Sequence, residues 1–217
     1  MAKIIVAQFI TLDGVVEDPD GSDGTEFGGW AFRHGREAVA GDKFSYGSIL
    51  ETGIFLFGRA TWEYFSTLWP ARDDSFARAL NAADKAVATH SEVNLDRWQN
   101  SRVVSGDVLD WARRESVERD VIIIGSGSLC DLFIDAGAVD EYRLRVFPTV
   151  TGAGRRLFAS GRHLELVSCE QLGPTTLTIY QRPRPYPPVS DGNSITRSVS
   201  NDQSTQRAER LETGAAA

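Results

Sequence analysis

The sequence predicts an α/β fold, with a mostly parallel sheet of eight strands that is completed by antiparallel strands at its C-terminal end. Up to Gly137, short apolar runs alternate with stretches of helical periodicity, the order expected when helices connect parallel strands. After Gly137, three strand-like runs follow one another without a helix, and such runs pair antiparallel. With 217 residues and 41% hydrophobic content, the chain can bury one full-sized core.

The individual elements follow from apolar periodicity and from the turn residues between them. We predict strands at 3–11, 54–57, 85–89, 103–105, 121–124, 141–150, 164–172 and 175–182. We predict helices at 36–51, 61–68, 75–83, 108–117 and 129–136, the last of them ended by Gly137. The segment 17–35 is rich in Gly, Asp and Pro and is expected to be a long loop.

Two short turns, each following an apolar strand, carry most of the functional information. One is GRAT at 58–61 and the other is GSGS at 125–128, and each is expected to open a helix. Helix N-termini present free N–H groups and a positive dipole end, so two of them at one sheet edge suit a ligand with several phosphates. Neither turn is a Rossmann or Walker motif. A strand–glycine–helix turn also arises from packing alone, and that alternative stays open for each turn.

Composition and charge exclude several classes of function. The net charge of −7 and isoelectric point near 5.0 argue against nucleic acid as a partner, because a phosphate backbone requires a basic face. No apolar stretch has the length of a membrane span and no signal peptide is recognisable, so we expect no membrane contact and a cytoplasmic location. Cys130 and Cys169 have no metal-ligand spacing, and no metal site is expected. We expect residues 183–217 to be a disordered Pro/Ser-rich tail, which leaves 1–182 as the folded domain.

Several short motifs occur in an order that points to one family. They are TLDGV at 11–15, GRATWE at 58–63, GSGSL at 125–129, VDEYRL at 139–144, FP at 147–148, GAG at 152–154 and RLF at 156–158. With them the chain resembles the dihydrofolate reductase superfamily, and more closely the C-terminal reductase domain of the bifunctional riboflavin-biosynthesis deaminase-reductase. The resemblance spans nearly all of 1–182. It implies a dihydrofolate-reductase-like three-layer sandwich with an NADPH site.

The resemblance assigns the cofactor to three turns and to one segment after the first strand. Arg59 would pair with the 2′-phosphate of NADPH, because a guanidinium offers charged, forked donors, and Thr61 would bind the pyrophosphate. The assigned residues are Val16 along the nicotinamide, Arg59, Thr61, Thr89 and Ser91 near the 2′-phosphate, and Gly125, Ser126, Gly127 and Ser128 at the third turn. Two of these depart from the family pattern: folate reductases carry Gly-Gly, often with a cis peptide, where this chain has Gly125-Ser126. Relatives often carry a basic residue at Ser128.

Asp42 is the candidate catalytic acid. It precedes Gly58 at the spacing at which folate reductases place the carboxylate that anchors the pterin ring, whereas riboflavin-pathway reductases generally lack this acid. An exposed surface aspartate is the open alternative. Asp13 is expected to shape a turn. Cationic candidates for a substrate phosphate are Arg33, Arg36, Lys43, Arg155 and Arg156.

The sequence therefore predicts an NADPH-dependent reductase of a small heterocyclic substrate. By resemblance it is most like 5-amino-6-(5-phosphoribosylamino)uracil reductase of riboflavin biosynthesis. Two alternatives stay open: a pterin or folate reductase that uses Asp42, and a nucleotide-binding module without turnover. A homodimer is expected, because relatives often dimerise and the C-terminal strands leave an edge that needs cover.

Overall fold

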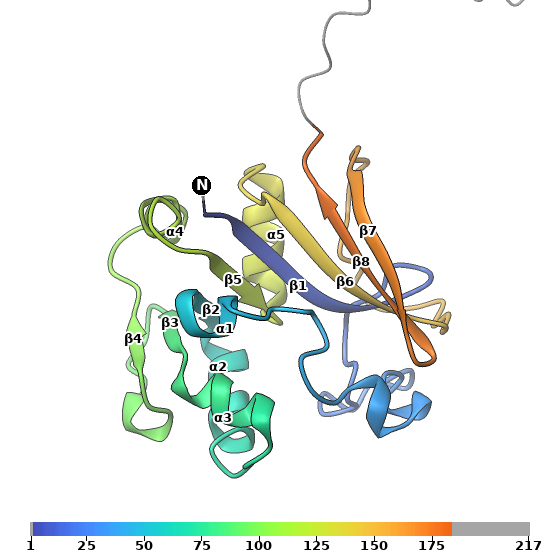
Figure 1. The fold of residues 1–217 in the computed structure, drawn as a ribbon, viewed down its shortest axis with the longest axis horizontal. Helices are drawn as coiled ribbons and strands as arrows, with labels where there is room; N and C mark the ends of the chain where they lie inside the picture. Colours follow the sequence, from blue (N-terminus) through green and yellow to red (C-terminus); the bar gives the residue numbers. More distant parts are fainter. Residues whose placement is uncertain (1, 184–217) are drawn as a thin grey trace, which may run out of the picture. The chain divides into compact units, whose positions relative to one another are not determined.

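The computed structural model describes residues 2–183, in which helices and strands alternate along most of the chain (Figure 1). The predicted tail at 183–217 lies outside the described residues except for Pro183. Within residues 2–183, no helix is long and apolar enough to cross a membrane.

The centre of the unit is one eight-stranded sheet in the order β4-β3-β2-β5-β1-β6-β8-β7. Its strands are β1 (Ile4–Thr11), β2 (Ile54–Gly58), β3 (Asp84–Ala88), β4 (Ser101–Val103), β5 (Val121–Ile124), β6 (Glu141–Phe147), β7 (Glu165–Leu172) and β8 (Thr175–Gln181). The six strands from β4 to β6 run parallel, while β8 pairs antiparallel with both β6 and β7. The predicted mostly parallel sheet with antiparallel C-terminal strands is confirmed.

Helices cover both faces of this sheet and make three layers (Figure 1). On one face lie α4 (Val108–Glu115) and α5 (Gly127–Asp135), where Trp111 and Phe133 join the core. On the other lie α1 (Ile49–Thr52), α2 (Arg59–Leu68) and α3 (Ser75–Ala82), where Trp62 and Leu80 are buried. Strands covered on both sides read as continuous apolar runs, which is why β2 and β5 are apolar at successive positions.

The prediction of a helix at 36–51 is wrong. The structure has only a 3-10 turn at Arg36–Ala38 and the single turn α1. The intervening chain takes positive φ at Gly41, Ser45 and Gly47, which a helix cannot accommodate. The Asp42 carboxylate also accepts hydrogen bonds from the backbone N–H groups of Tyr46 and Gly47, so a local turn replaces the helical ladder.

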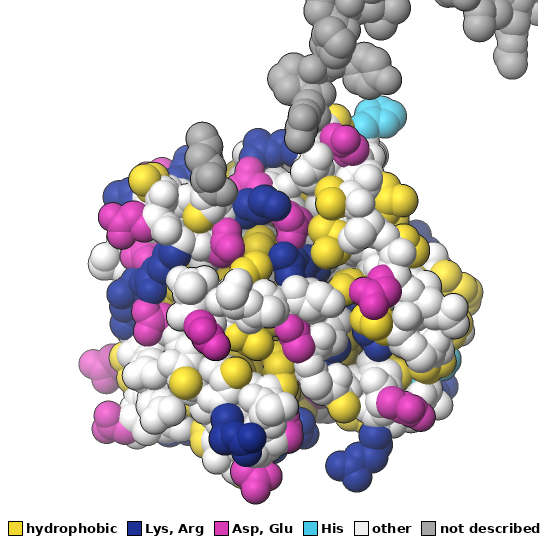
Figure 2. Space-filling model, in the orientation of Figure 1, with side chains coloured by type: hydrophobic (Ala, Val, Ile, Leu, Met, Phe, Trp, Pro, Cys, Tyr) yellow, Lys and Arg dark blue, Asp and Glu magenta, His cyan; other side chains and the backbone are white. Residues whose placement is uncertain are grey.

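The edge strand β7 is exposed along almost its whole length. Its apolar residues Leu166 and Val167 are both more than half exposed. Figure 2 shows hydrophobic side chains gathered over this β7–β8 end of the sheet, whereas charges of both signs are interspersed elsewhere on the same face.

Candidate functional site

The two glycine turns meet at the carboxyl edge of the sheet, one at the end of β2 and the other at the end of β5, its neighbour. The Ser126 hydroxyl accepts a hydrogen bond from Gly58 N at 2.7 Å, and Ser126 N donates to Thr61 Oγ1 at 3.0 Å. A Cβ on Gly125 would lie 2.8 Å from Thr61 Cγ2, so the close approach of the turns requires glycine there. The sequence predicted that these turns share an edge, and the structure joins them directly.

The helices that start at these turns have no side-chain caps. Gly58 precedes α2 and Ser126 precedes α5, and neither provides a side-chain hydrogen bond to the first turn. In contrast, α3 and α4, which start elsewhere, are capped by Asp74 and Asp107. The first N–H groups of α2 and α5 are therefore available, with the positive helix dipole behind them, to an anionic ligand.

Ser126 holds an unusual backbone conformation for a residue with a side chain. Its φ is 53° and that of Gly125 is 64°, so two successive residues are left-handed. A left-handed non-glycine residue costs roughly 1–2 kcal/mol. The peptide bond between the two residues is trans, unlike the cis bond typical of folate reductases. The two hydrogen bonds of Ser126 hold this conformation in place.

A third segment reaches the same edge from the end of β1. Val15 forms an isolated antiparallel bridge with Arg156, and Val16 N donates to the backbone oxygen of Arg155 at 3.0 Å. Val16 is buried against the core that α5 covers. The segment predicted to lie along a nicotinamide is thus tied to the loop that follows β6.

Asp13 fixes this junction. Its carboxylate accepts hydrogen bonds from the Thr11 hydroxyl at 2.6 Å and from Gly152 N at 2.9 Å. These bonds lower the pKa of Asp13 to about 2. Asp13 is consequently ionised at neutral pH, and it positions a turn rather than supplying a proton.

Arg155 is a residue that the sequence analysis did not single out from the other cations. Its guanidinium lies against the backbone of Gly127, the first residue of α5, because a Cβ on Gly127 would be 1.9 Å from Arg155 Nη2. The only carboxylate paired with it among the described residues is Asp131, at a long 3.5 Å. A cation at the positive end of a helix is electrostatically unfavourable, and Asp131 offsets this only at a long distance. The sequence signal that could have identified Arg155 was the pair Arg155-Arg156, which follows a strand whose carboxyl end lies at the same edge as the turns.

The other predicted cofactor residues surround this centre. Arg59 is the first residue of α2, half-exposed, and its guanidinium pairs with Glu63 at 2.8 Å. Thr89 and Ser91 follow β3, the next strand, where the Thr89 hydroxyl accepts from Ser91 N and donates to its carbonyl. Ser128 is exposed in the first turn of α5.

Asp42 is hydrogen-bonded within its own turn and not to the glycine turns. It is half-buried, and each of its carboxylate oxygens accepts one backbone N–H bond at 2.9 Å from its own turn. Beneath the third turn, Cys130 is buried, its pKa raised to about 12, so it remains a neutral thiol. Within residues 2–183, no three His, Cys, Asp or Glu side chains gather as metal ligands.

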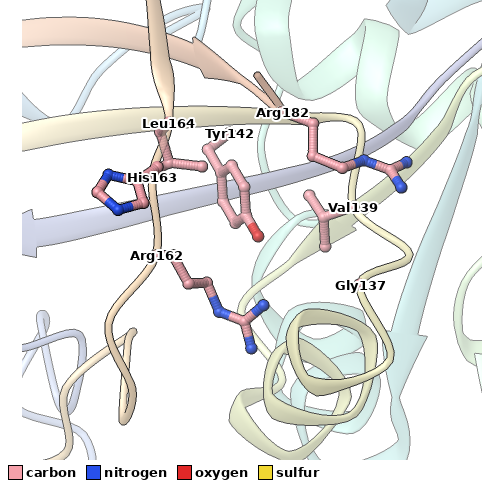
Figure 3. Close-up of a pocket in the computed structure, with 7 residues that line it drawn as sticks. All are labelled: Gly137, Val139, Tyr142, Arg162, His163, Leu164 and Arg182. Atoms are coloured by element: carbon pink, nitrogen blue, oxygen red, sulfur yellow. The ribbon is translucent and has the colours of Figure 1, made fainter. Parts of the chain in front are cut away.

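A separate hollow of about 220 Å³ lies at the amino end of β6 (Figure 3). It is lined by Gly137, Val139, Tyr142, Arg162, His163, Leu164 and Arg182. Its two arginines already pair with Asp135 and Asp140. This hollow is at the opposite end of the parallel strands from the turns and contains none of the predicted site residues.

Comparison with known proteins places this arrangement in a family. The model of the family described as "RibD C-terminal domain" matches residues 2–178, which is most of the chain. The chain belongs to the RibD C-terminal domain family. This is the dihydrofolate-reductase-like reductase domain, so the family predicted from the motifs is confirmed.

Two similar proteins share between 20% and 23% of their residues with this chain. The chain is 23% identical over 164 residues to "Uncharacterized protein YyaP" of Bacillus subtilis (strain 168), which covers 72% of this chain and 80% of that protein. A crystal structure from Shewanella sp. PV-4, described as "Putative riboflavin biosynthesis protein", has the same fold with a TM-score of 0.63. It is 20% identical and covers 84% of this chain and 99% of the other.

Proposed function

We propose that this protein is an NADPH-dependent reductase of a small heterocyclic substrate, most like 5-amino-6-(5-phosphoribosylamino)uracil reductase of riboflavin biosynthesis. One observation carries the proposal: the uncapped N-termini of α2 and α5 are joined at one sheet edge, with Arg59 and Arg155 beside them. Family membership supports the same activity. The residues present fit a dinucleotide, because glycine backbone and free N–H groups line the edge where its phosphates would lie.

Each part of the edge then has a role in holding the cofactor. The first N–H groups of α2 and α5, with Thr61, Gly125, Ser126 and Gly127, would bind the pyrophosphate. Arg59, with Thr89 and Ser91 nearby, would hold the 2′-phosphate, and Val16 would line the nicotinamide. Relatives often carry a basic residue at the position of Ser128. In this chain the cation at the N-terminus of α5 would instead be Arg155. NADPH supplies a hydride when bound.

The geometry of Asp42 favours the pyrimidine substrate over a pterin. A pterin reductase would need this carboxylate to face the substrate, but both of its oxygens are bonded to backbone N–H groups of its own turn. Asp13 is ionised at the site edge and therefore does not donate the proton that completes the reduction.

We infer further that two protomers pair through β7. An exposed edge strand with apolar residues such as Leu166 and Val167 invites pairing with a second copy.

The cofactor assignment is tested by Arg59→Ala. Loss of a charge-assisted bond to phosphate costs about 1.5–3 kcal/mol, so the Kd for NADPH should rise roughly 10- to 100-fold, while the Kd for NADH changes little. Fluorescence titration measures both. Arg113→Ala is the matched control, because Arg113 is an exposed arginine in an equivalent intrahelical ion pair on α4. Equal losses for NADPH and NADH would remove the 2′-phosphate assignment.

Turnover separates an enzyme from a binding module. NADPH oxidation is followed with 5-amino-6-(5-phosphoribosylamino)uracil and with dihydropterin and dihydrofolate substrates. Oxidation with the pyrimidine is the expected result. Tight NADPH binding without oxidation of any substrate would favour the module without turnover.

A further inference from the structure

Gln8 is a buried polar residue in the middle of the mostly apolar strand β1. This strand lies between β5 and β6 in the sheet (Figure 1), and Gln8 is only 8% exposed. Because side chains alternate along a strand, Gln8 points to the same face as Val6 and Ile10, which belong to the core that α5 covers. A buried amide is unfavourable unless its hydrogen bonds are made, so its partners explain what it does in this strand.

The amide group of Gln8 is bonded to the turn that precedes α5. Its Nε2 donates to the carbonyl oxygen of Gly125 at 2.8 Å and to the sulfur of Cys130 at 3.1 Å. The Cys130 thiol donates in turn to the same Gly125 carbonyl, at 3.3 Å. Burial raises the pKa of Cys130 to about 12, so the thiol keeps the proton that this bond needs. The amide and the thiol together hold the carbonyl of Gly125.

The peptide unit between Gly125 and Ser126 is thereby held at both of its polar groups. Its carbonyl oxygen is bonded to Gln8 of β1, and its N–H donates to Thr61 Oγ1 of α2 at 3.0 Å. If this peptide unit rotated, it would lose both bonds. The two bonds therefore oppose the release of the left-handed conformation at Gly125 and Ser126, which persists only where the surroundings enforce it.

The conformation of this peptide unit decides where α5 directs its first N–H groups. Gly127 begins α5 one residue beyond the peptide unit, and Ser126 provides no side-chain cap to the first turn. We propose that Gln8 is a positioning residue for the cofactor: it holds the Gly125 carbonyl so that the first N–H groups of α5 face the pyrophosphate. This inference rests on the proposed function, which assigns the pyrophosphate of NADPH to α5.

A purely structural role is the alternative, in which Gln8 only satisfies a buried carbonyl and stabilises the fold. The two roles differ in what the folded protein binds. Loss of a structural bond lowers the free energy of unfolding but leaves the affinity of the folded protein unchanged. Loss of a positioning bond weakens the binding of each ligand that contains the pyrophosphate, and of no other.

Gln8→Leu tests this difference, because leucine is similar in size to glutamine and donates no hydrogen bond. At a temperature at which circular dichroism shows the variant to be folded, the Kd for NADPH and the Kd for NADH should both rise roughly tenfold. The Kd for 2′-AMP, which has the 2′-phosphate but no pyrophosphate, should stay within about twofold. Arg59→Ala should weaken NADPH and 2′-AMP instead. An unchanged Kd for NADPH in Gln8→Leu, or an equal loss of 2′-AMP affinity, overturns the proposal.

Thr178→Val is the matched control. The buried Thr178 hydroxyl donates to the carbonyl of Leu144 in the same sheet, and Thr178 lies on β8, away from the turns. Its loss should lower stability and leave all three dissociation constants within about twofold. A loss of NADPH affinity as large as that in Gln8→Leu would show that a broken buried bond anywhere in the sheet is sufficient, and would overturn the positioning role.

Gln8→Glu decides the question if Gln8→Leu does not fold. A carboxylate cannot donate to the Gly125 carbonyl but a protonated carboxyl group can, and burial beside a carbonyl oxygen raises the pKa of such a group. NADP⁺, which is stable in acid, is the probe, and the wild type at each pH corrects for titration of the ligand. The Kd of the variant should be close to that of the wild type at about pH 5.5 and at least roughly tenfold higher at about pH 8. The same ratio at both pH values overturns the proposal.

Failure of the role of Gln8 and failure of the reductase function give different results. A wild type that binds neither NADPH nor NADH contradicts the proposed function, and the role of Gln8 with it. A wild type that binds NADPH, together with a Gln8→Leu variant that binds it equally well, contradicts only the role of Gln8.

Discussion

At the scale of single residues, Lys43 couples the fold to pH. Burial lowers its pKa in the folded protein to about 8, against 10.5 in the unfolded chain. Between these values the unfolded chain binds more protons, so the free energy of unfolding rises as pH increases from about 8 to about 10.5. Below pH 8 the protonated ammonium costs the fold about 3 kcal/mol.

Lys43→Met should therefore stabilise the protein at neutral pH. We expect a gain on the order of 2 kcal/mol at pH 7, because the lost bond to Val39 offsets part of the desolvation cost. The gain should largely disappear at pH 10. Urea unfolding at both pH values measures it. Lys85, whose pKa is also about 8, remains in both proteins and cancels in the comparison. The same gain at both pH values contradicts this account.

Contacts between individual residues are also what the sequence could not predict. The glycine turns are visible as glycines after apolar runs, but the bond from Gly58 N to the Ser126 hydroxyl joins residues far apart in sequence. Spacing cannot show such a contact, since it depends on β2 and β5 becoming neighbours. The burial of Lys43 was equally invisible, because burial of a charge is decided by what packs around it.

At the scale of elements, α5 and its turn form a unit with Arg155. A Cβ on Gly127 would overlap the guanidinium, which is the far end of a flexible side chain and can move away. Gly127→Ala should thus cost little stability, since Ala is favoured over Gly in a helix, but it should displace Arg155 from the N-terminus of α5. We expect a roughly tenfold weaker NADPH affinity. Gly161→Ala is the control, because a Cβ there meets no atom within 4 Å. An unchanged affinity in Gly127→Ala would exclude Arg155 from the cofactor site.

The elements also show why prediction succeeded in some segments and failed in others. β2 and β5 are buried on both faces, so their apolar runs were unambiguous. The segment 36–51 has helical spacing of apolar residues, yet Phe44 and Tyr46 reach the core from a non-helical loop. Asp42 and the glycines around it were the local signals against a helix, and tertiary packing does not need helical geometry to bury two aromatic rings.

At the scale of the whole molecule, the order of motifs determined the family and the parallel sheet placed the turns at one edge. Both follow from chain order, since parallel strands bring their carboxyl ends together whatever their side chains. The packing of the segment 36–48 was not predictable in the same way. Tyr46 contacts Phe55 of β2 and Lys43 contacts Phe76 of α3, and these elements approach the segment only in the folded protein.

The assembly of two copies is the remaining property of the whole molecule. If β7 pairs with β7 of a second protomer, the exposed Leu166 and Val167 become buried in the interface. The double variant Leu166→Asp/Val167→Asp should then be monomeric, while its urea unfolding midpoint at low protein concentration stays close to that of the wild type. Light scattering coupled to size exclusion measures the mass. Val117→Asp replaces a still more exposed apolar residue beyond α4 and should remain dimeric. The double variant should be monomeric because like charges placed along a shared strand edge repel each other and separate the protomers. A monomeric wild type would contradict the dimer. A double variant that stays dimeric would show that the interface lies elsewhere than at β7.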